Sequence, residues 1–353
     1  MNFGQIKVWS CAAALVLACA LSSHAQGNRF NTPGNILISD QYNNRLIEVN
    51  PNNHKIVWQF GDGSSVAGPH SVVGVNDAQR IGFISLVAGT GVPAGAEPTC
   101  PNGCPDNRVM LVDPRGHIIW QYGKAGVTGS GPNELNTPVQ NTWLPSGDIL
   151  ITDQGNMRVI EVNLFKHIVW QYGQTGVGGD GFNQLNSPNS AELLANGHIL
   201  IADEGNNRVI EVTRKKKIVW SYGCSTCSEL SEAAFASRLP DGTTLITDGG
   251  NNRILDVDPA GNVVWSYYTN ARDGSVSNPA PSRAVMLKNG NVLISDQNNM
   301  QVIEIDSNQN IVWTQGQIAV AGDGFDMLNG PYDAKVIGDY TGITPPFDEN
   351  HEK

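Results

Sequence analysis

The chain has 353 residues, a formal net charge of −11 and only 16% charged residues, alongside 39 glycines. An acidic protein repels phosphate backbones, so nucleic acid is excluded as an expected partner. Sparse charge with abundant glycine indicates a turn-rich all-β protein rather than a disordered one.

The first 25 residues predict a secretory signal peptide. Lys7 supplies a positive start, Cys11–Leu21 is apolar, and Ser23-His24-Ala25 is a small-x-small cleavage site. The apolar run is shorter than the about 20 residues that a membrane-spanning helix needs. We therefore expect an exported protein, periplasmic or secreted, with no transmembrane segment after cleavage. A lipoprotein anchored through Cys19 is the second interpretation, because Leu17 is bulky for that motif.

A repeat of about fifty residues follows this segment, and a period of that size in short strands indicates a propeller or solenoid. Its pattern is G-x-I-L-I-x-D-x-x-N-N-R-V-I-E-V, then a turn, then I-V-W-x-Y-G. The copies are Asn35–Gly61, Asn107–Gly123, Asp148–Gly173, His198–Gly223, Thr243–Tyr267 and Asn291–Gly316. The strands are apolar on both faces, which fits blades stacked against neighbours on both sides.

A fourth, inner strand is predicted ahead of each later triplet of strands, usually just after a proline. The predicted inner strands are Pro69–Val75, Pro138–Leu144, Pro188–Leu194, Ala233–Leu239, Pro281–Leu287 and Pro331–Ile337. The first triplet has none before it, and the last inner strand follows the sixth triplet. The sequence therefore predicts an all-β, six-bladed β-propeller of four-stranded blades, closed by the C-terminal strand joining the N-terminal blade. The expected organisation is a signal peptide at 1–25, a lead-in at 26–33, the propeller at 34–337 and a flexible tail at 338–353.

The repeat resembles that of the NHL-repeat family. The shared features are the D-x-x-N-x-R-[IV] hairpin, the strand ending in Gly, and Gly-rich linkers such as Gly178–Phe182. The resemblance covers about residues 34–337 and implies the propeller fold, whereas function stays open because such folds host binding modules and enzymes alike. The second copy departs from the pattern, since it lacks the Asp and carries an insertion, Val92–Asp106. The sixth copy has Met300-Gln301 in place of Asn-Arg.

The repeated Asp and Arg residues are interpreted as a structural staple within each hairpin, because a catalytic group is needed only once. Function is then expected where the symmetry breaks. We call the face that carries the hairpins between the second and third strands the top face, and the opposite one the bottom face. The insertion Val92–Asp106 and the pair Cys224-x-x-Cys227 both fall on the top face.

The four cysteines of the mature chain predict two local disulfides, since an exported protein can form them. The candidates are Cys100 with Cys104 and Cys224 with Cys227. A redox pair at Cys224 and Cys227 and a four-cysteine zinc site are the alternatives. The first needs free thiols with a lowered pKa, and the second needs two loops on different blades to meet.

Variable polar residues of the inner strands predict a ligand site at the channel mouth. The candidates are His70, Gln140, Asn141, Asn189, Glu192, Arg283, Tyr332, Asp333 and Lys335. Of these, Glu192, Asp333, Asn141 and Asn189 could offer oxygen ligands to calcium. The alternative is that Glu192–Lys335 and Arg283–Asp333 neutralise each other across a wet channel. Only His70 lies near the top, so the histidine-bound zinc of the peptide-amidating lyases in the NHL-like group is not expected.

These features favour an exported, non-catalytic binding module acting through its top face and central channel. Its expected partner is a protein, peptide or saccharide, and no cofactor is predicted. The alternative is a metal-assisted, calcium-type hydrolase or lyase at the channel mouth. The basic run Arg214–Lys217 is interpreted as a solvated turn, with contact to an anionic surface as its alternative.

Overall fold

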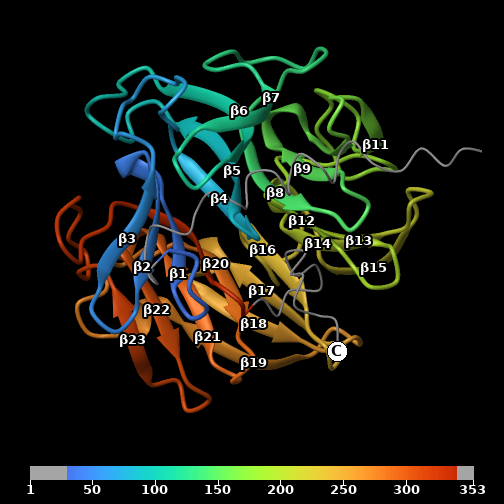
Figure 1. The fold of residues 1–353 in the computed structure, drawn as a ribbon. Helices are drawn as coiled ribbons and strands as arrows, with labels where there is room; N and C mark the ends of the chain where they lie inside the picture. The colour runs from blue at the N-terminus through green and yellow to red at the C-terminus, as the bar shows by residue number, and fades with distance from the viewer. Residues whose placement is uncertain (1–29, 340–353) are drawn as a thin grey trace, which may run out of the picture.

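The computed structural model describes residues 30–339, which form six four-stranded antiparallel sheets around a central channel (Figure 1). This confirms the predicted all-β, six-bladed propeller. The predicted signal peptide lies outside the described residues, as does the tail beyond Asp339. In the part of the chain that the structure describes, no helix is long and apolar enough to cross a membrane.

Each blade runs from an inner strand at the channel to an outer strand at the rim. From the channel outwards, the strands of successive blades are β24 (Pro331–Val336), β1 (Ile36–Asp40), β2 (Arg45–Asn50) and β3 (Lys55–Phe60); β4 (Val75–Ile81), β5 (Ile84–Val92), β6 (Cys104–Val112) and β7 (Ile118–Gly123); β8 (Pro138–Trp143), β9 (Ile149–Asp153), β10 (Arg158–Val162) and β11 (Ile168–Tyr172); β12 (Ser190–Leu193), β13 (Ile199–Asp203), β14 (Arg208–Val212) and β15 (Ile218–Gly223); β16 (Ala233–Arg238), β17 (Thr244–Asp248), β18 (Arg253–Val257) and β19 (Val263–Tyr268); β20 (Pro281–Met286), β21 (Val292–Asp296), β22 (Gln301–Ile305) and β23 (Ile311–Gln315).

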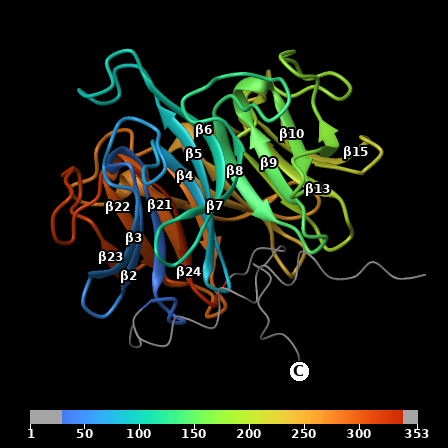
Figure 2. The ribbon, with the colours of Figure 1, turned by 45° about the horizontal axis from the view of Figure 1, so that its top comes forward.

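The ring closes as predicted, because β24 pairs antiparallel with β1 in the first blade (Figure 2). Ile36 lies opposite Val336, and Ser39 lies opposite Asp333. The pairing extends past the strand ends, where the backbone N–H of Ile337 donates to the carbonyl of Asn35 at 2.8 Å. Joining the two ends of the chain removes two exposed sheet edges.

The hydrophobic core is divided into clusters that lie between neighbouring blades. One cluster combines Leu46 and Phe60 of the first blade with Val87 and Met110 of the second. Strands packed on both faces need apolar side chains in both directions, which explains why the repeat shows little alternation.

The hairpin staple forms as predicted in four blades, where Arg Nε donates to an Asp oxygen at 2.7 Å. The pairs are Asp40–Arg45, Asp153–Arg158, Asp203–Arg208 and Asp248–Arg253. The second Asp oxygen accepts a backbone N–H from the linker entering the same blade. In the first blade this donor is Asn329, at 2.7 Å. The motif therefore ties each hairpin to its own inner strand.

The two departing repeats rebuild the same staple from other residues. In the second blade Gly89 lies opposite Arg108, where other blades have the Asp, and Asp106 supplies the carboxylate instead. A Cβ at position 89 would lie 2.6 Å from the Asp106 carboxyl carbon, so only glycine fits beside it. In the sixth blade Arg272 comes from the preceding linker and donates to Asp296 at 2.5 Å.

One predicted inner strand is wrong. Residues 69–74 belong to a linker, and the inner strand of the second blade is β4, Val75–Ile81. The linker wraps around Arg108, whose guanidinium donates to the carbonyls of Gly68 and Ser71 at 2.9 Å each. Pro69 therefore does not mark a strand start, unlike Pro138, Pro281 and Pro331.

Candidate functional site

Five of the predicted candidates line the central channel as buried side chains. They are Gln140, Glu192, Arg283, Asp333 and Lys335, each no more than 8% exposed. The fold adds Asp77, which lies on β4 and is 2% exposed. Sequence reasoning missed this residue because the inner strand of the second blade was placed six residues too early.

Asp77, Arg283, Asp333 and Lys335 form one compact ion-paired group, called here the channel tetrad. Lys335 Nζ lies 2.7 Å from Asp77 Oδ1 and 2.6 Å from Asp333 Oδ2. Arg283 lies 2.8 Å from Asp77 Oδ1 and 2.9 Å from Asp333 Oδ1. Two carboxylates thus face two cations, and the group is neutral as a whole. Buried charges need such pairing, since an unpaired one is very costly.

The two tetrad carboxyl groups differ in acidity. Burial tends to raise the pKa of Asp77, but Lys335 and Arg283 outweigh this effect and hold the pKa below its usual value. Burial wins at Asp333, whose pKa is raised in spite of Arg283 and Lys335. Of the predicted pairs, Arg283–Asp333 is confirmed, whereas Lys335 binds Asp77 and Asp333 rather than Glu192.

Glu192 differs from the two tetrad carboxyl groups in having no ion pair in the described chain. Ser237 provides a side-chain hydrogen bond, whereas Glu192 Oε2 is buried and has no hydrogen-bond partner in the described chain. Burial raises the pKa of Glu192 to about 7, against the opposing attraction of Arg283 and Lys335. The tetrad uses both cations for its own carboxylates, so Glu192 holds its proton close to neutral pH.

A small cavity lies above the tetrad. Its lining includes Gln140, Phe235, Arg283 and Tyr332, and its volume is about 10 Å³. That is room for about one water molecule. Phe235 closes one side, with the Arg283 guanidinium 3.9 Å from its ring centroid. The interior of the channel is therefore nearly filled by its own side chains.

The channel mouth is bordered by amide side chains and one carboxyl group. Glu204 Oε2 accepts hydrogen bonds from Gln154 Nε2 and Asn189 Nδ2, both at 2.9 Å. Asn189 also lies 2.9 Å from the Tyr332 hydroxyl. Burial raises the pKa of Glu204 to about 7, and the nearby Glu232 adds to the effect. Burial likewise raises the pKa of Tyr332, so this phenol keeps its proton.

A second group of amides continues the border of the mouth. Gln41 Nε2 donates to Asn76 Oδ1 at 2.8 Å, and Gln297 Nε2 donates to Gln41 Oε1 at 2.7 Å. Gln41, Gln154, Glu204 and Gln297 were missed from the sequence, although each directly follows the repeated Asp. That position is Gly249 in the fifth blade. Its variation among otherwise similar hairpins was the available signal.

Two predicted candidates lie outside this arrangement. His70 is exposed in the linker before β4, with its ring 6.4 Å from that of His117, so its predicted place at the channel mouth is wrong. Asn141 turns toward the neighbouring inner strand, where its Nδ2 lies 3.4 Å from the Asp77 carbonyl. The Asn141 Oδ1 atom is buried without a partner in the described chain.

The four residues suggested for calcium are engaged in different contacts. Asp333 belongs to the channel tetrad, Asn189 to the mouth, and Asn141 to the interface with β4. Among residues 30–339, no group of three or more His, Cys, Asp or Glu side chains is arranged to hold a metal ion.

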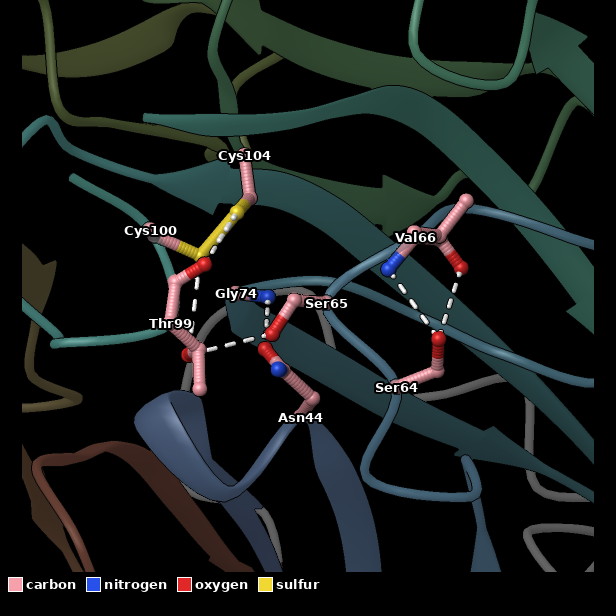
Figure 3. Close-up of a disulfide and its surroundings, with 8 residues drawn as sticks. All are labelled: Asn44, Ser64, Ser65, Val66, Gly74, Thr99, Cys100 and Cys104. Atoms are coloured by element: carbon pink, nitrogen blue, oxygen red, sulfur yellow. Dashed lines mark hydrogen bonds between the residues drawn. A yellow bond between two sulfur atoms is a disulfide. The ribbon is translucent and has the colours of Figure 1, made fainter. Parts of the chain in front are cut away.

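Both predicted disulfides form, and both lie in the loops of the top face. Cys100 joins Cys104, and Cys224 joins Cys227. The first closes the insertion of the β5–β6 hairpin, which projects from its blade (Figure 2). Beside it Ser65 Oγ donates to Thr99 Oγ1 at 3.2 Å, which ties the insertion to the linker before β4 (Figure 3).

The insertion also reaches the seam where the ring closes. Glu97 Oε1 accepts a hydrogen bond from Asn329 Nδ2 at 3.1 Å, immediately before β24. Buried Cys100 packs with Val73 and Val92, and Tyr42 of the first blade lies against this cluster. The insertion is therefore a fixed part of the top face.

These features define a class: a closed six-bladed β-propeller with a charge-balanced, nearly filled channel and stapled loops on one face. A family model described as outer membrane protein assembly factor BamB, PQQ_2, matches residues 105–325. The match spans more than half of the chain, so the chain belongs to this BamB-like family. The matched model is not that of the NHL-repeat family, which the hairpin resembles. Family and disulfides are both consistent with an exported protein.

No curated protein is significantly similar to the chain in sequence. Similar solved structures include a protein of unknown function from Bacteroides caccae, at 16% identity and a TM-score of 0.56, covering 80% of this chain and 93% of that one. A streptogramin B lyase matches at 13% identity and a TM-score of 0.52, covering 82% and 80%. Virginiamycin B lyase from Staphylococcus aureus matches at 16% identity and 0.50, covering 80% and 84%. At these identities the likeness concerns the fold alone.

Proposed function

We propose that this protein is an exported, non-catalytic binding propeller that docks a partner protein on its top face. The observation that carries the proposal is the filled channel. The cavity beside Asp77 and Arg283 measures about 10 Å³, which is too small for a substrate, and the tetrad charges are satisfied internally. The stapled and asymmetric loops around the mouth are left as the surface that can recognise a partner.

A protein partner is favoured over a peptide or saccharide by the apolar side chains on the top-face loops. Val66 and Phe182 are 74% and 76% exposed. Aromatic side chains are enriched among the residues that dominate protein–protein binding. The name of the matched family, an assembly factor, supports the same choice. The proposal includes export through the segment 1–25, to the periplasm or beyond. It also includes an NHL-like origin of the repeat hairpin.

Site-specific photo-crosslinking in cells that produce the full chain tests the proposal. A photoreactive residue replacing Val66 or Phe182 is expected to give a discrete adduct with a second protein. Phe83, which is 45% exposed in the bottom hairpin between β4 and β5, is the matched control and should give none. Equal labelling from both faces, or no adduct from Val66 and Phe182, would contradict docking on the top face.

Metal-assisted hydrolysis or elimination is the second candidate, and the state of Glu192 favours it. A carboxyl group with a pKa of about 7 is suited to general acid–base catalysis. A calcium ion at Glu192 would need Asp333 to leave its contacts with Arg283 and Lys335. Stoichiometric calcium in the purified protein, lost on Glu192→Gln, would support this candidate over the binding propeller.

A further inference from the structure

The bottom face carries an uneven distribution of charge in its outer turns, which connect the third and fourth strands of each blade. In the fourth blade this turn contains Arg214–Lys217, and in the third blade the equivalent turn contains Phe165 and Lys166. The two turns belong to neighbouring blades (Figure 1). Together, Phe165, Lys166 and Arg214–Lys217 are called here the basic tip.

The two turns are joined by direct contacts. Trp170 on β11 donates its indole N–H to the carbonyl of Arg214 at 3.1 Å. The Arg214 guanidinium lies over the same ring, 5.1 Å from its centroid, and pairs with Glu161. Arg214 is thus held by the third blade. In the described part of the chain, Lys215, Lys216 and Lys217 form no ion pair with an acidic residue, so their charges face solvent.

Phe165 has no structural reason to be aromatic. It is 83% exposed, more than any other large apolar side chain in residues 30–339. The equivalent residues of other blades are Arg115, Lys215, Ala260 and Asn308. A bulky ring left in water at a turn is unfavourable unless a partner covers it.

The two turns share a backbone conformation with the equivalent turns of other blades. Lys166 and Lys216 both adopt a left-handed conformation with φ of 68°. The second and fifth blades place Gly116 and Gly261 at the same turn position. Glycine is much better suited to that conformation than lysine. The sixth blade has Gln309 at this position with φ of 65°, so the conformation itself is not specific to lysine.

The basic tip is local to one side of the propeller. The equivalent turns of the fifth and sixth blades, Asp258–Asn262 and Asp306–Asn310, each contain an aspartate and no Lys or Arg. The whole chain carries a net charge of −11, so an anionic surface would repel most of the molecule. Attraction at one edge would bind such a surface in a single orientation.

We propose that the basic tip docks the propeller on an anionic phospholipid surface. The lysines would contact headgroup phosphates, and Phe165 would insert its ring at the interface. The tip is a pair of projecting turns rather than a concave pocket, which suits a flat membrane surface. Combining basic residues with an exposed apolar ring is the pattern of interfacial binding, and each Lys or Arg near such a surface strengthens it about five-fold.

Vesicle co-sedimentation with the purified mature chain tests the proposal. Binding is expected to vesicles that contain phosphatidylglycerol and to fall as salt is raised, with little binding to phosphatidylcholine alone. The double variant Lys215→Glu/Lys217→Glu should weaken binding by roughly a hundred-fold or more, because two attractive charges become repulsive. Phe165→Ser should weaken binding while preserving its salt dependence.

The charge-matched control is Lys55→Glu/Lys124→Glu, which alters two exposed lysines outside the tip and should leave binding unchanged. A far-UV spectrum and melting curve for each variant establish that it is folded. Equal binding to both kinds of vesicle, or equal loss in the control variant, would overturn the proposal. Binding to an acidic protein without binding to anionic vesicles would overturn it as well. Because the test uses lipid alone, its result is separate from that of docking on the top face.

Discussion

Glu192 has no counter-ion of its own in the channel, because Arg283 and Lys335 are shared by Asp77 and Asp333. Its pKa of about 7 lies above the value of 4.5 expected in the unfolded chain. Between these two values the folded protein binds more protons than the unfolded chain. The contribution of Glu192 to stability is therefore complete at low pH and is lost as the pH rises toward 7.

Glu192→Gln should remove this loss, because an amide resembles the protonated carboxyl group in shape and carries no charge. We expect the variant to match wild type near pH 4 and to exceed it above pH 7, by at most about 3 kcal/mol. Urea denaturation across this pH range measures the difference in free energy of unfolding. A constant difference at every pH would show that folding does not shift the pKa of Glu192.

Asp77→Asn provides a contrast at the same depth. The pKa of Asp77 is lowered by Lys335 and Arg283 against the effect of burial, so its charge stabilises the fold above its unfolded pKa. Removing the charge leaves two buried cations with one carboxylate in the tetrad. This variant should be destabilised at neutral pH, by about 3–5 kcal/mol.

The sequence predicted the residue types of the channel better than their partners. Arg283, Asp333 and Lys335 were found because strand alternation places every second residue toward the channel. Asp77 escapes this argument because Pro69 lies in a linker and its strand, β4, begins only at Val75. Glu204 and Gln154 were missed because they lie in hairpin turns, and only the closed ring brings turns from different blades to one mouth.

At the scale of the blade, the second repeat shows that the staple is a requirement of the fold rather than of one position. Gly89 occupies the position that an Asp holds in other blades, and it leaves the space that the Asp106 carboxylate fills. Asp106 also accepts the backbone N–H of Val73 at 2.7 Å, which fixes the linker before β4. Glycine at position 89 and aspartate at position 106 therefore depend on each other.

Asp106→Asn should therefore destabilise the protein by about 3–5 kcal/mol, because it leaves the buried Arg108 guanidinium unpaired. The double variant Gly89→Asp/Asp106→Gly returns the carboxylate to its position in the other blades. It should recover most of the loss relative to the single variant, as measured by urea denaturation. Wild-type stability in Asp106→Asn, or no recovery in the double variant, would contradict this account.

At the scale of the whole molecule, the β1–β24 pairing makes stability depend on the last strand. A chain ending at Gly330 loses β24, Asp333 and Lys335, and with them half of the channel tetrad. We expect it to lose cooperative thermal unfolding and to become sensitive to limited proteolysis. A chain ending at Asp339 keeps all six closed blades and serves as the control. Unchanged melting of the shorter chain would contradict closure through β24.

The same pairing has a consequence for how the chain is synthesised and folds. The first blade emerges first but stays incomplete until residues 331–336 arrive, so the edge of β1 remains without its neighbour for nearly the whole length of synthesis. Unpaired edges of this kind promote association between chains. A newly made chain can therefore associate with other chains through the unpaired edge of β1 until β24 arrives, and such association would appear as aggregation of molecules whose ring has not closed.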